Sequence, residues 1–319
     1  MAIIAGIIFG FLIIRLIISG VNLFSRTRLP QLQTEQQYLV SVLIPARNEG
    51  QNIGRILQQT ANNAYRNVEI LVYDDDSEDN TAEIVQKNAN KNSRIKLIPT
   101  QKLPEQWLGK NHACFQLAAQ AKGDYLLFLD ADVTISSELI INSLAYLKKH
   151  GLSLMSIFPE QKMKTFGERI TVPVMNWILT SLLPLPLIKN TKQKSLAAAN
   201  GQFMLFEARN YHKNQWHKHF KKQPVEDINI MRAIKKQKNK GHTLLSGGQI
   251  KCRMYTNFKE SVNGFSKNTH EFFGKSYMLM SLFGLITTFG FIPVFIYAKF
   301  FGLGLYLFLA VLLRLFTSL

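Results

Sequence analysis

The stretch Tyr125-Leu126-Leu127-Phe128-Leu129-Asp130-Ala131-Asp132 decides the fold. Its apolar run is short enough for a buried strand, and the two carboxylates that follow, Asp130 and Asp132, bracket one small residue. Two acids that meet at a strand end repel each other unless a cation lies between them, and carboxylate oxygens suit Mg²⁺ or Mn²⁺. The stretch therefore predicts either a metal site that holds a diphosphate or two solvated acids that open the next helix.

Two further predicted strands precede this stretch, and each ends in a polar turn. Leu39 to Pro45 is an apolar, β-branched run that is typical of a central strand in a parallel sheet. Val68 to Tyr73 leads directly into the acids Asp74, Asp75 and Asp76, which exceed what a helix cap requires. Because open α/β sheets bind ligands beyond the carboxyl ends of their strands, these turns predict a binding site on an α/β fold.

The composition limits the partners and the compartment. The chain has 319 residues, a formal net charge of +17 and 47% hydrophobic residues. Its two cysteines, Cys114 and Cys252, are too few for a disulfide framework, so a reducing compartment is expected. The basic excess predicts an acidic partner, which leaves nucleic acid, anionic lipid headgroups and phosphorylated substrates.

Apolar segments at both ends of the chain favour a membrane protein. Residues 2–24 are almost entirely apolar and approach the ~20 residues that cross a bilayer. Arg26 and Arg28 follow, so the positive-inside rule places the next segment in the cytoplasm. Tyr277 to Tyr297 and Leu303 to Phe316 predict a helical hairpin at the other end.

Two internal segments allow more than one interpretation. Phe166 to Ile188 is strongly apolar but holds three prolines, which favours an interfacial segment, the lining of a path for an apolar acceptor, or an ordinary buried helix over a bilayer span. His212 to Lys222 mixes basic residues with Trp216. Such a tract binds single-stranded nucleic acid in some proteins, but beside a membrane anchor it indicates headgroup attachment, so no nucleic-acid partner is expected.

Three segments in this order resemble the inverting, family 2 nucleotide-sugar glycosyltransferases of the GT-A type. They are Val42 to Glu49, Tyr73 to Thr81 and Gly123 to Asp132, and the resemblance extends from Leu39 to about Gly274. It implies a GT-A fold, in which helices flank a mostly parallel central sheet. It also implies an enzyme that transfers a hexose from a UDP-sugar.

The resemblance assigns the two first loops to the nucleotide. Pro45, Arg47 and Glu49 match the loop that touches the nucleotide in this family, and Asp75 matches the carboxylate that accepts from the uracil or ribose, with Asp74 beside it.

The acidic pair after the third strand matches the family's metal site. Asp130 and Asp132 correspond to the metal-binding pair, and Asp132 is expected to be the direct ligand of Mg²⁺ or Mn²⁺. The chain departs from the family at two turn positions, where Asp76 and Asn80 replace glycines.

Further matches imply contacts with the diphosphate and the sugar. Lys110 opens the segment before the acidic strand, where the resemblance implies support for the nucleotide. Gly201, between Asn200 and Gln202, matches a glycine-led stretch that lines the sugar pocket. A cation near the departing diphosphate is also needed, and Lys267 or Arg253 could supply it; Lys267 fits a basic amphipathic helix on the membrane equally well.

A second acidic pair, later in the chain, is the candidate for the catalytic base. Glu226 and Asp227 open a predicted helix and match the family's acidic motif, in which one carboxylate is the catalytic base. The interpretation favours Asp227 as that base, with Glu226 as the alternative.

Two short pieces carry the prediction of the acceptor. Gly109 to Cys114 and Arg253 to Tyr255 look like the branch that glycosylates carotenoid acids of the 4,4'-diaponeurosporenoate type, so an apolar lipid acceptor is expected. Polyprenyl phosphate or a glycerolipid is the alternative acceptor. A non-catalytic membrane protein that binds nucleotide sugars is the alternative from another class, although all the matched carboxylates are present.

The expected organisation has three parts. Residues 1–25 form an N-terminal transmembrane helix, residues 26–274 form the cytoplasmic GT-A catalytic domain with interfacial helices, and residues 275–319 form a transmembrane helical hairpin. The expected location is the inner (plasma) membrane of the cell.

Overall fold

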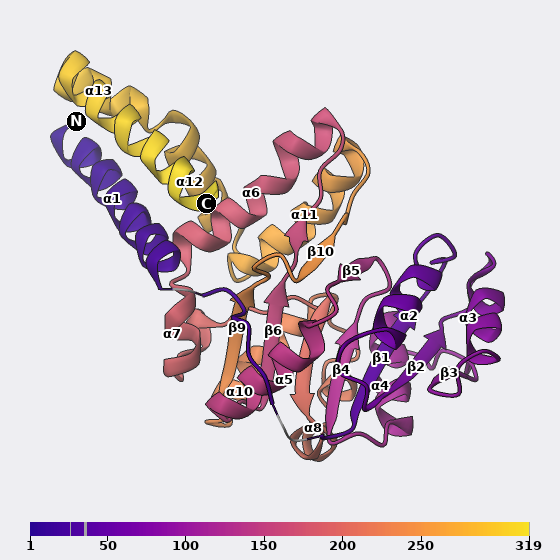
Figure 1. Cartoon of the computed structure of the whole chain (residues 1–319). Helices are drawn as coiled ribbons and strands as arrows, with labels where there is room; N and C mark the ends of the chain where they lie inside the picture. Colours follow the sequence, from indigo (N-terminus) through magenta and orange to yellow (C-terminus); the bar gives the residue numbers. More distant parts are fainter. Residues whose placement is uncertain (26, 35–36, 319) are drawn as a thin grey trace. The chain divides into compact units, whose positions relative to one another are not determined.

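The computed structural model describes residues 1–25, 27–34 and 37–318, apart from the side chains of residues 267, 268 and 271 (Figure 1). The described chain packs as two compact units. We call Met1–Thr27, Met163–Leu187 and Tyr255–Leu319 the helical unit, and Arg28–Lys162 with Ile188–Met254 the sheet unit.

The sheet unit is built on a central sheet that has seven strands in the described residues. In spatial order they are β3 (Ile95–Ile98), β2 (Val68–Asp74), β1 (Val40–Ala46), β4 (Tyr125–Leu129), β8 (Phe203–Glu207), β6 (Leu154–Phe158) and β9 (Gly241–Leu245). All adjacent pairs are parallel except those of β8, which runs antiparallel to both neighbours. The predicted mostly parallel sheet is therefore confirmed.

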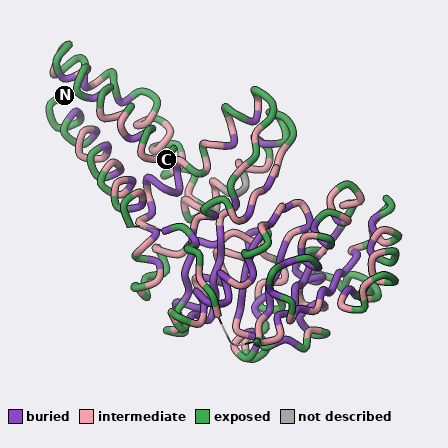
Figure 2. Tube along the Cα trace, viewed as in Figure 1, coloured by how far each residue is buried: buried purple, intermediate pink, exposed green. Residues whose placement is uncertain are grey.

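Apolar side chains on both faces of the central strands explain why the sheet is covered on both sides. Along β1, Val42 and Ile44 belong to one buried core, which α2 (Ile53–Ala61) covers. Leu43 belongs to a second core on the opposite face, together with Leu117 of α4 (Gly109–Gln120). Alternate residues of a strand point to opposite faces, so a continuous apolar run needs helices on both. Figure 2 shows these strands as mostly buried.

The remaining elements of the sheet unit complete these layers. They are α3 (Thr81–Ala89), β5 (Val133–Ile135), α5 (Leu139–His150), β7 (Glu160–Gln161), η1 (Lys194–Leu196), α8 (Ala208–Asn214), α9 (Trp216–His219), α10 (Glu226–Lys236) and β10 (Ile250–Cys252), with α7 (Leu185–Asn190) at the unit boundary. A second small sheet has the order β5-β10-β7. Its antiparallel pair places Cys252 opposite Val133, the residue after Asp132.

The sheet register gathers several loops at one edge. Ala46 at the end of β1 lies opposite Asp74 at the end of β2, and β4 is parallel to β1. The loops that follow these strands therefore emerge at the same edge. Because β8 is antiparallel to β4 and Phe203 pairs with Leu129, the residues before β8 reach this edge as well.

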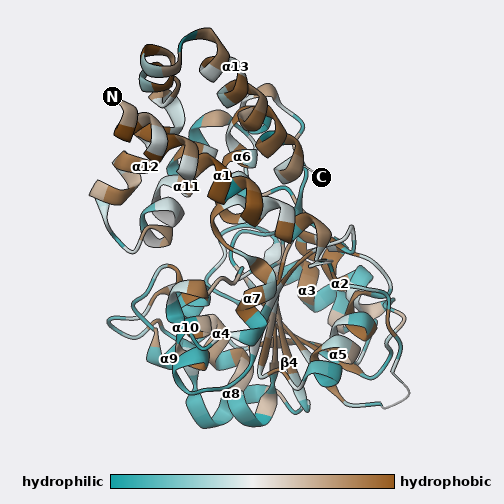
Figure 3. Cartoon of the chain, turned by 90° about the vertical axis from the view of Figure 1, so that its left-hand side faces the viewer, coloured by the Kyte–Doolittle hydropathy of each residue, from teal (hydrophilic) through white to brown (hydrophobic). Residues whose placement is uncertain are grey.

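The helical unit holds the apolar ends of the chain. It contains α1 (Ala2–Phe24), α6 (Phe166–Leu182), α11 (Phe258–Phe272), α12 (Tyr277–Phe289) and α13 (Phe291–Ser318). In the described part of the chain, Ala2–Phe24 and Tyr277–Ser318 are long and apolar enough to cross a membrane, and few of their residues are buried. Figure 3 shows their hydrophobic colouring, in contrast with the hydrophilic α8 and α9.

The C-terminal helices break at Lys299, between the two predicted segments, and also at one place that was not predicted. The sequence predicts one helix over Tyr277–Tyr297, whereas α12 ends at Phe289 and α13 begins at Phe291. Pro293 explains this break, because it has no N–H to continue the helical hydrogen bonds and is best tolerated in the first turn of a new helix. A second kink lies at Lys299, whose φ is 53°.

The segment Phe166 to Ile188, whose sequence allows several interpretations, contains the helix α6. Thr165 caps α6 and Glu168 completes a capping box, while Pro173 lies inside the helix. Val172 and Ile178 are buried, whereas Phe166 is 79% exposed. One packed face and one exposed apolar end fit both the interfacial and the buried-helix interpretation.

Candidate active site

The ends of β1 and β2 place an arginine beside a carboxylate. The backbone N–H of Asp75 donates to the carbonyl of Ala46 at 2.8 Å, which fixes the two strand ends together. Arg47 Nη1 lies 3.9 Å from Asp75 Oδ2. Burial raises the pKa of Asp75, and the charge of Arg47 opposes this change. A Cβ added to Gly109 would overlap the Asp75 carboxylate, so only glycine allows the start of α4 to come this close.

Hydrogen bonds between the first two loops hold this part of the site in shape. Backbone N–H groups of the first loop donate to side-chain oxygens of the second: Asn48 to Ser77, Glu49 to Thr81, and Gly50 to Asp79. Asp76 has a φ of 58°, the left-handed region that glycine adopts most easily. The replacement of the expected glycine by Asp76 therefore leaves a glycine-like backbone at this turn. Asn80 has a φ of −81° and needs no glycine.

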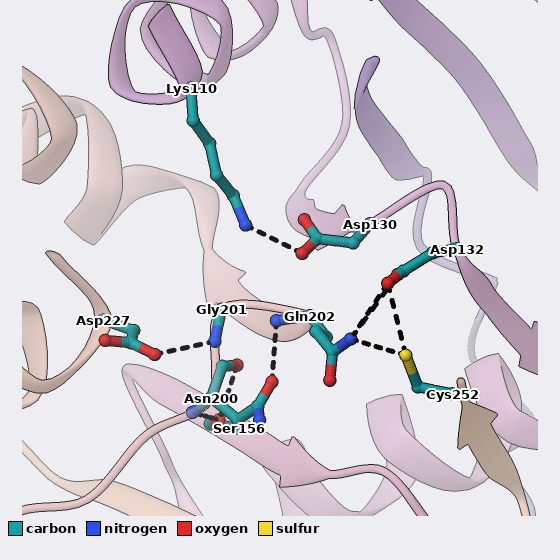
Figure 4. Close-up of polar contacts among 9 residues, drawn as sticks. All are labelled: Lys110, Asp130, Asp132, Ser156, Asn200, Gly201, Gln202, Asp227 and Cys252. Atoms are coloured by element: carbon teal, nitrogen blue, oxygen red, sulfur yellow. Dashed lines mark hydrogen bonds and ion pairs between the residues drawn. The ribbon is translucent and has the colours of Figure 1, made fainter. Parts of the chain in front are cut away.

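Lys110 joins the start of α4 to the end of β4. Its Nζ lies 2.8 Å from Asp130 Oδ2 in an ion pair (Figure 4). Burial opposes the charge of Lys110, but the carboxylates of Asp130 and Glu226 outweigh it and raise the pKa of the ammonium group. The site therefore holds a fixed positive charge next to one acid of the Asp130–Asp132 pair.

Gly201 lies at the centre of the acidic cluster. A Cβ added there would lie 3.4 Å from Glu226 Oε1, 3.5 Å from Lys110 Nζ and 3.7 Å from Asp227 Oδ2. The Gly201 N–H donates to Asp227 Oδ2 at 2.9 Å. The absence of a side chain at residue 201 thus leaves space between Lys110 and the two acids of α10.

The two acids that open α10 differ in their surroundings. Asp227 is half-buried, and its Oδ1 accepts from the N–H of Ile228 at 2.7 Å. Burial raises the pKa of Asp227, and these backbone N–H groups counteract the rise. Glu226 is 6% exposed, and burial raises its pKa to about 7, although Lys110 opposes the shift. The carboxylate of Asp227 is therefore held in one orientation by backbone N–H groups, while burial makes Glu226 a weaker acid than an exposed glutamate.

Asp132 contacts neutral partners. Gln202 Nε2 lies 3.4 Å from Asp132 Oδ2, and Cys252 Sγ lies 3.3 Å from the same oxygen. Gln202 Nε2 also lies 2.8 Å from Cys252 Sγ, so the three side chains form a closed set. Burial and the charge of Asp130 raise the pKa of Asp132.

A third carboxylate belongs to the same region. Burial raises the pKa of Glu49, and the charges of Asp132 and Asp130 raise it further, so the three acids repel one another. No ion pair among the described residues involves Asp132. A divalent cation would relieve this repulsion.

The acids fit a divalent cation that shares its ligands with a substrate. Across residues 1–25, 27–34 and 37–318, no group of three or more His, Cys, Asp or Glu side chains is arranged to hold a metal. Mg²⁺ is usually bound through one or two carboxylates plus substrate phosphates, rather than by a complete protein cage. Asp132 with Asp130 meets this requirement, with phosphate oxygens as the further ligands.

The structure brings together most of the residues that the sequence singles out. Lys110, Asp130, Gly201, Glu226 and Asp227 share direct contacts or surround the same position. Their roles remain predictions, because the geometry alone does not assign them.

Two predicted residues make their contacts elsewhere, and the side chain of a third lies outside the described part of the structure. Pro45 is inside β1 opposite Tyr73, and the Asp74 side chain bonds Ser77 within its own turn. Lys267 belongs to α11 of the helical unit, and its side chain lies outside the described part of the structure. Cys252 was not predicted as a site residue, because only the pairing of β10 with β5 brings it to Asp132.

The comparisons with known proteins agree with this geometry. Residues 41–213, more than half of the chain, match the family model described as "Glycosyl transferase family 2". A 4,4'-diaponeurosporenoate glycosyltransferase of Staphylococcus haemolyticus is 27% identical over 259 residues, which cover 79% of this chain and 68% of that protein. A protein of the same name from Staphylococcus aureus (strain N315) is 30% identical over 47% of this chain and 40% of its own length.

A solved structure shares the fold. The mannosyltransferase PcManGT from Pyrobaculum calidifontis, in complex with GDP-Man and Mn²⁺, superposes with a TM-score of 0.56 at 15% identity, over 79% of this chain and 69% of that one. The predicted fold and the predicted family are both confirmed. The chain belongs to glycosyl transferase family 2, and it is a glycosyltransferase.

Proposed function

We propose that the chain transfers a hexose from a UDP-sugar to an apolar lipid, a carotenoid or related isoprenoid, with inversion at the anomeric carbon. One observation carries the proposal. Lys110, Glu226 and Asp227 surround the bare backbone of Gly201, and Lys110 also pairs with Asp130, at the sheet edge where β1, β2 and β4 end. The curated relatives named for 4,4'-diaponeurosporenoate support the acceptor class.

The donor would bind along the loops that follow β1, β2 and β4. Asp75, with Arg47 3.9 Å away, would accept hydrogen bonds from the uracil or ribose. Lys110 would place its charge beside the diphosphate, where negative charge grows as the bond to the sugar breaks. Glu49 would complete the nucleotide contacts of the first loop.

Asp132 and Asp130 would hold Mg²⁺ or Mn²⁺. The cation supplies positive charge that stabilises the departing diphosphate. Asp132 is the better placed ligand, because its side chain has neutral partners, whereas Asp130 is paired with Lys110.

Asp227 would take the proton of the attacking acceptor. Inversion requires one displacement, in which the acceptor oxygen forms a bond to the anomeric carbon as the bond to UDP breaks on the opposite side. The Gly201 N–H fixes the Asp227 carboxylate, and the missing side chain at residue 201 leaves room for the sugar. A carboxylic acid acceptor is already ionised near pH 7, and the base then contributes less.

The apolar ends of the chain would place the enzyme in a membrane. Ala2–Phe24 and Tyr277–Ser318 would cross the bilayer, with the catalytic part of residues 26–274 in the cytoplasm, where the UDP-sugar is. The location would be the inner membrane of the cell.

A direct assay tests the proposal. Membranes of cells that express the wild type or Asp132→Asn are incubated with UDP-glucose and extracted carotenoids, and lipid products are identified by mass spectrometry. We expect glycosylated pigment from the wild type and none from the variant. Transfer to polyprenyl phosphate or a glycerolipid but never to pigment would overturn the acceptor. No transfer to any lipid, with UDP-sugar still bound, would favour a non-catalytic protein.

A further inference from the structure

Two arginines of the helical unit contact the same indole. Arg15 of α1 and Arg314 of α13 each place the guanidinium carbon 4.1 Å from the centre of the Trp177 ring of α6. Arg15 is only 2% exposed, whereas Arg314 is exposed. The two cations therefore lie within twice that distance of each other, inside a unit whose other exposed side chains are largely apolar.

Neither arginine has a negative partner in the described residues. Arg15 Nη2 and Nε donate to Ser181 Oγ at 2.8 and 3.2 Å, which is a neutral acceptor. Of the carboxylates that the structure describes in this unit, Glu168 bonds backbone N–H groups at the start of α6 and Glu260 bonds Thr256. Aromatic rings attract cations but do not neutralise them, so two uncompensated charges remain close together.

Trp177 adds a second, independent sign of a missing partner. Its indole Nε1 is buried and has no hydrogen-bond acceptor among the described residues. A buried donor without an acceptor is unfavourable, and native proteins rarely retain one unless a ligand or water satisfies it. The cluster therefore contains two guanidinium groups and one N–H group that has no acceptor among the described residues.

We propose that Arg15, Arg314 and Trp177 bind the anionic headgroup of a membrane lipid through a phosphate or carboxylate oxygen. Arginine forks match the geometry of both oxyanions, and basic pockets between membrane helices bind acidic headgroups. The ligand must combine an oxyanion with hydrocarbon, because the helices that carry the site are apolar. Arg314 is exposed, so its side chain can move to admit the headgroup. This site rests on the proposed membrane placement, but not on the transfer reaction.

The competing explanation is that the arginines only clamp α1, α6 and α13 together. Against this explanation, a charged residue inside an apolar span is by default a candidate for a functional site. A clamp predicts no preference among lipids, whereas a headgroup site predicts a preference for acidic lipids that depends on Arg314.

Native mass spectrometry of the full chain in detergent distinguishes the two. The probes are phosphatidylglycerol against phosphatidylcholine, and oleate against methyl oleate, so that phosphate and carboxylate are tested separately. We expect the wild type to retain an acidic lipid about tenfold better than its neutral counterpart, as for a charged hydrogen bond. Arg314→Gln should reduce this preference to about twofold or less. Arg15→Gln should do the same if it folds.

Arg169→Gln is the matched control, because Arg169 is an exposed arginine of α6 that makes no contact with Trp177. It removes the same charge and should keep the preference. Equal retention of acidic and neutral lipid by the wild type, or an equal loss in Arg169→Gln, would overturn the site. Displacement of phosphatidylglycerol by millimolar inorganic phosphate would overturn the lipid as its ligand and leave a site for a free oxyanion. Failure of the wild type to float with phosphatidylcholine vesicles would instead overturn the membrane placement.

Discussion

Both units bury charged side chains, but they satisfy them in different ways. In the sheet unit, Asp130 and Asp227 are held by Lys110 and by backbone N–H groups, partners that a charged substrate can share or replace. In the helical unit, Arg15 is held by Ser181 and aromatic rings, and Asn22 ties one helix to another. The comparison teaches that the polar groups of the sheet unit have partners that a substrate could replace, whereas most of those in the helical unit tie helices to one another. Substitutions in the two units should therefore separate rate from stability.

The largest effect is expected at Asp227. Asp227→Asn removes the proposed base but keeps the shape of the side chain, so kcat should fall about 10²- to 10⁴-fold with an acceptor hydroxyl. The thermal unfolding midpoint should fall only by the loss of one hydrogen bond, because the amide oxygen can accept from either Gly201 or Ile228 but not from both N–H groups. The measurement is transfer from UDP-glucose, with unfolding followed in parallel.

The size of this fall in kcat depends on the chemical class of the acceptor. With a carboxylic acid acceptor, the fall should be much smaller, since no proton has to be removed near pH 7. An Asp227→Asn enzyme with full activity toward a hydroxyl acceptor would remove Asp227 from the mechanism. Glu226→Gln would then be the variant to examine.

Asn22→Ala should affect stability and leave the reaction unchanged. Asn22 Nδ2 donates to the carbonyls of Thr180 and Leu183 at 2.7 and 2.8 Å, and its Oδ1 accepts from the Leu185 N–H at 2.8 Å. Loss of these buried bonds should cost about 2–3 kcal/mol of unfolding free energy. The measurement is denaturant unfolding in detergent, together with KM for the donor.

The matched control for that variant is Ser266→Ala, whose hydroxyl makes one exposed local bond to Asn263. It should change neither stability nor KM. A tenfold change of KM in Asn22→Ala would contradict the division between the two units.

Gly109→Ala should weaken donor binding without unfolding the protein. The added methyl group would overlap the Asp75 carboxylate and displace it, which should raise KM for the UDP-sugar about tenfold. Gly54→Ala in α2 is the control, because its Cβ would make an ordinary contact at 3.5 Å with Ile84. That control should keep KM and stabilise the helix by up to about 1 kcal/mol. An unchanged KM in Gly109→Ala would argue against Asp75 as a donor contact.

The last prediction concerns pH. Burial raises the pKa of Glu226 from 4.5 to about 7, so the folded state holds its proton more tightly than the unfolded chain does. This contribution to stability is complete below pH 4.5 and is lost as pH rises through about 7. Glu226→Gln should therefore lose less stability than the wild type between pH 5 and 8. Parallel unfolding curves of the two proteins over that range would contradict the pKa shift.

The central strands and their acidic turns were predictable from sequence, because their signal is local. The expected strand Val68 to Tyr73 matches β2 to within one residue, and the apolar run before Asp130 matches β4. Each is a short buried run that ends in polar residues, so neither needs distant information. The gathering of the turns at one edge followed from parallel pairing alone.

The parts that escaped prediction depend on distant contacts or on a single residue. Cys252 reaches Asp132 only because β10, three residues long, pairs with β5, and so short a strand has no periodicity to detect. The break between α12 and α13 lies inside the segment Tyr277–Tyr297, which was expected to be one helix, and it depends on the single residue Pro293. The left-handed backbone at residue 76 was not predicted, because a glycine there would have indicated it and Asp76 does not.

The reversed direction of β8 has a consequence for how such an enzyme can change its substrates. The loops of the proposed donor site follow the carboxyl ends of β1, β2 and β4. Asn200, Gly201 and Gln202 instead precede the amino end of β8, which runs in the opposite direction. The length of the segment that leads into β8 can therefore vary without shifting the register of the donor loops. The proposed sugar pocket and the proposed nucleotide site are carried by chain segments of opposite direction, which lets one diverge while the other stays fixed.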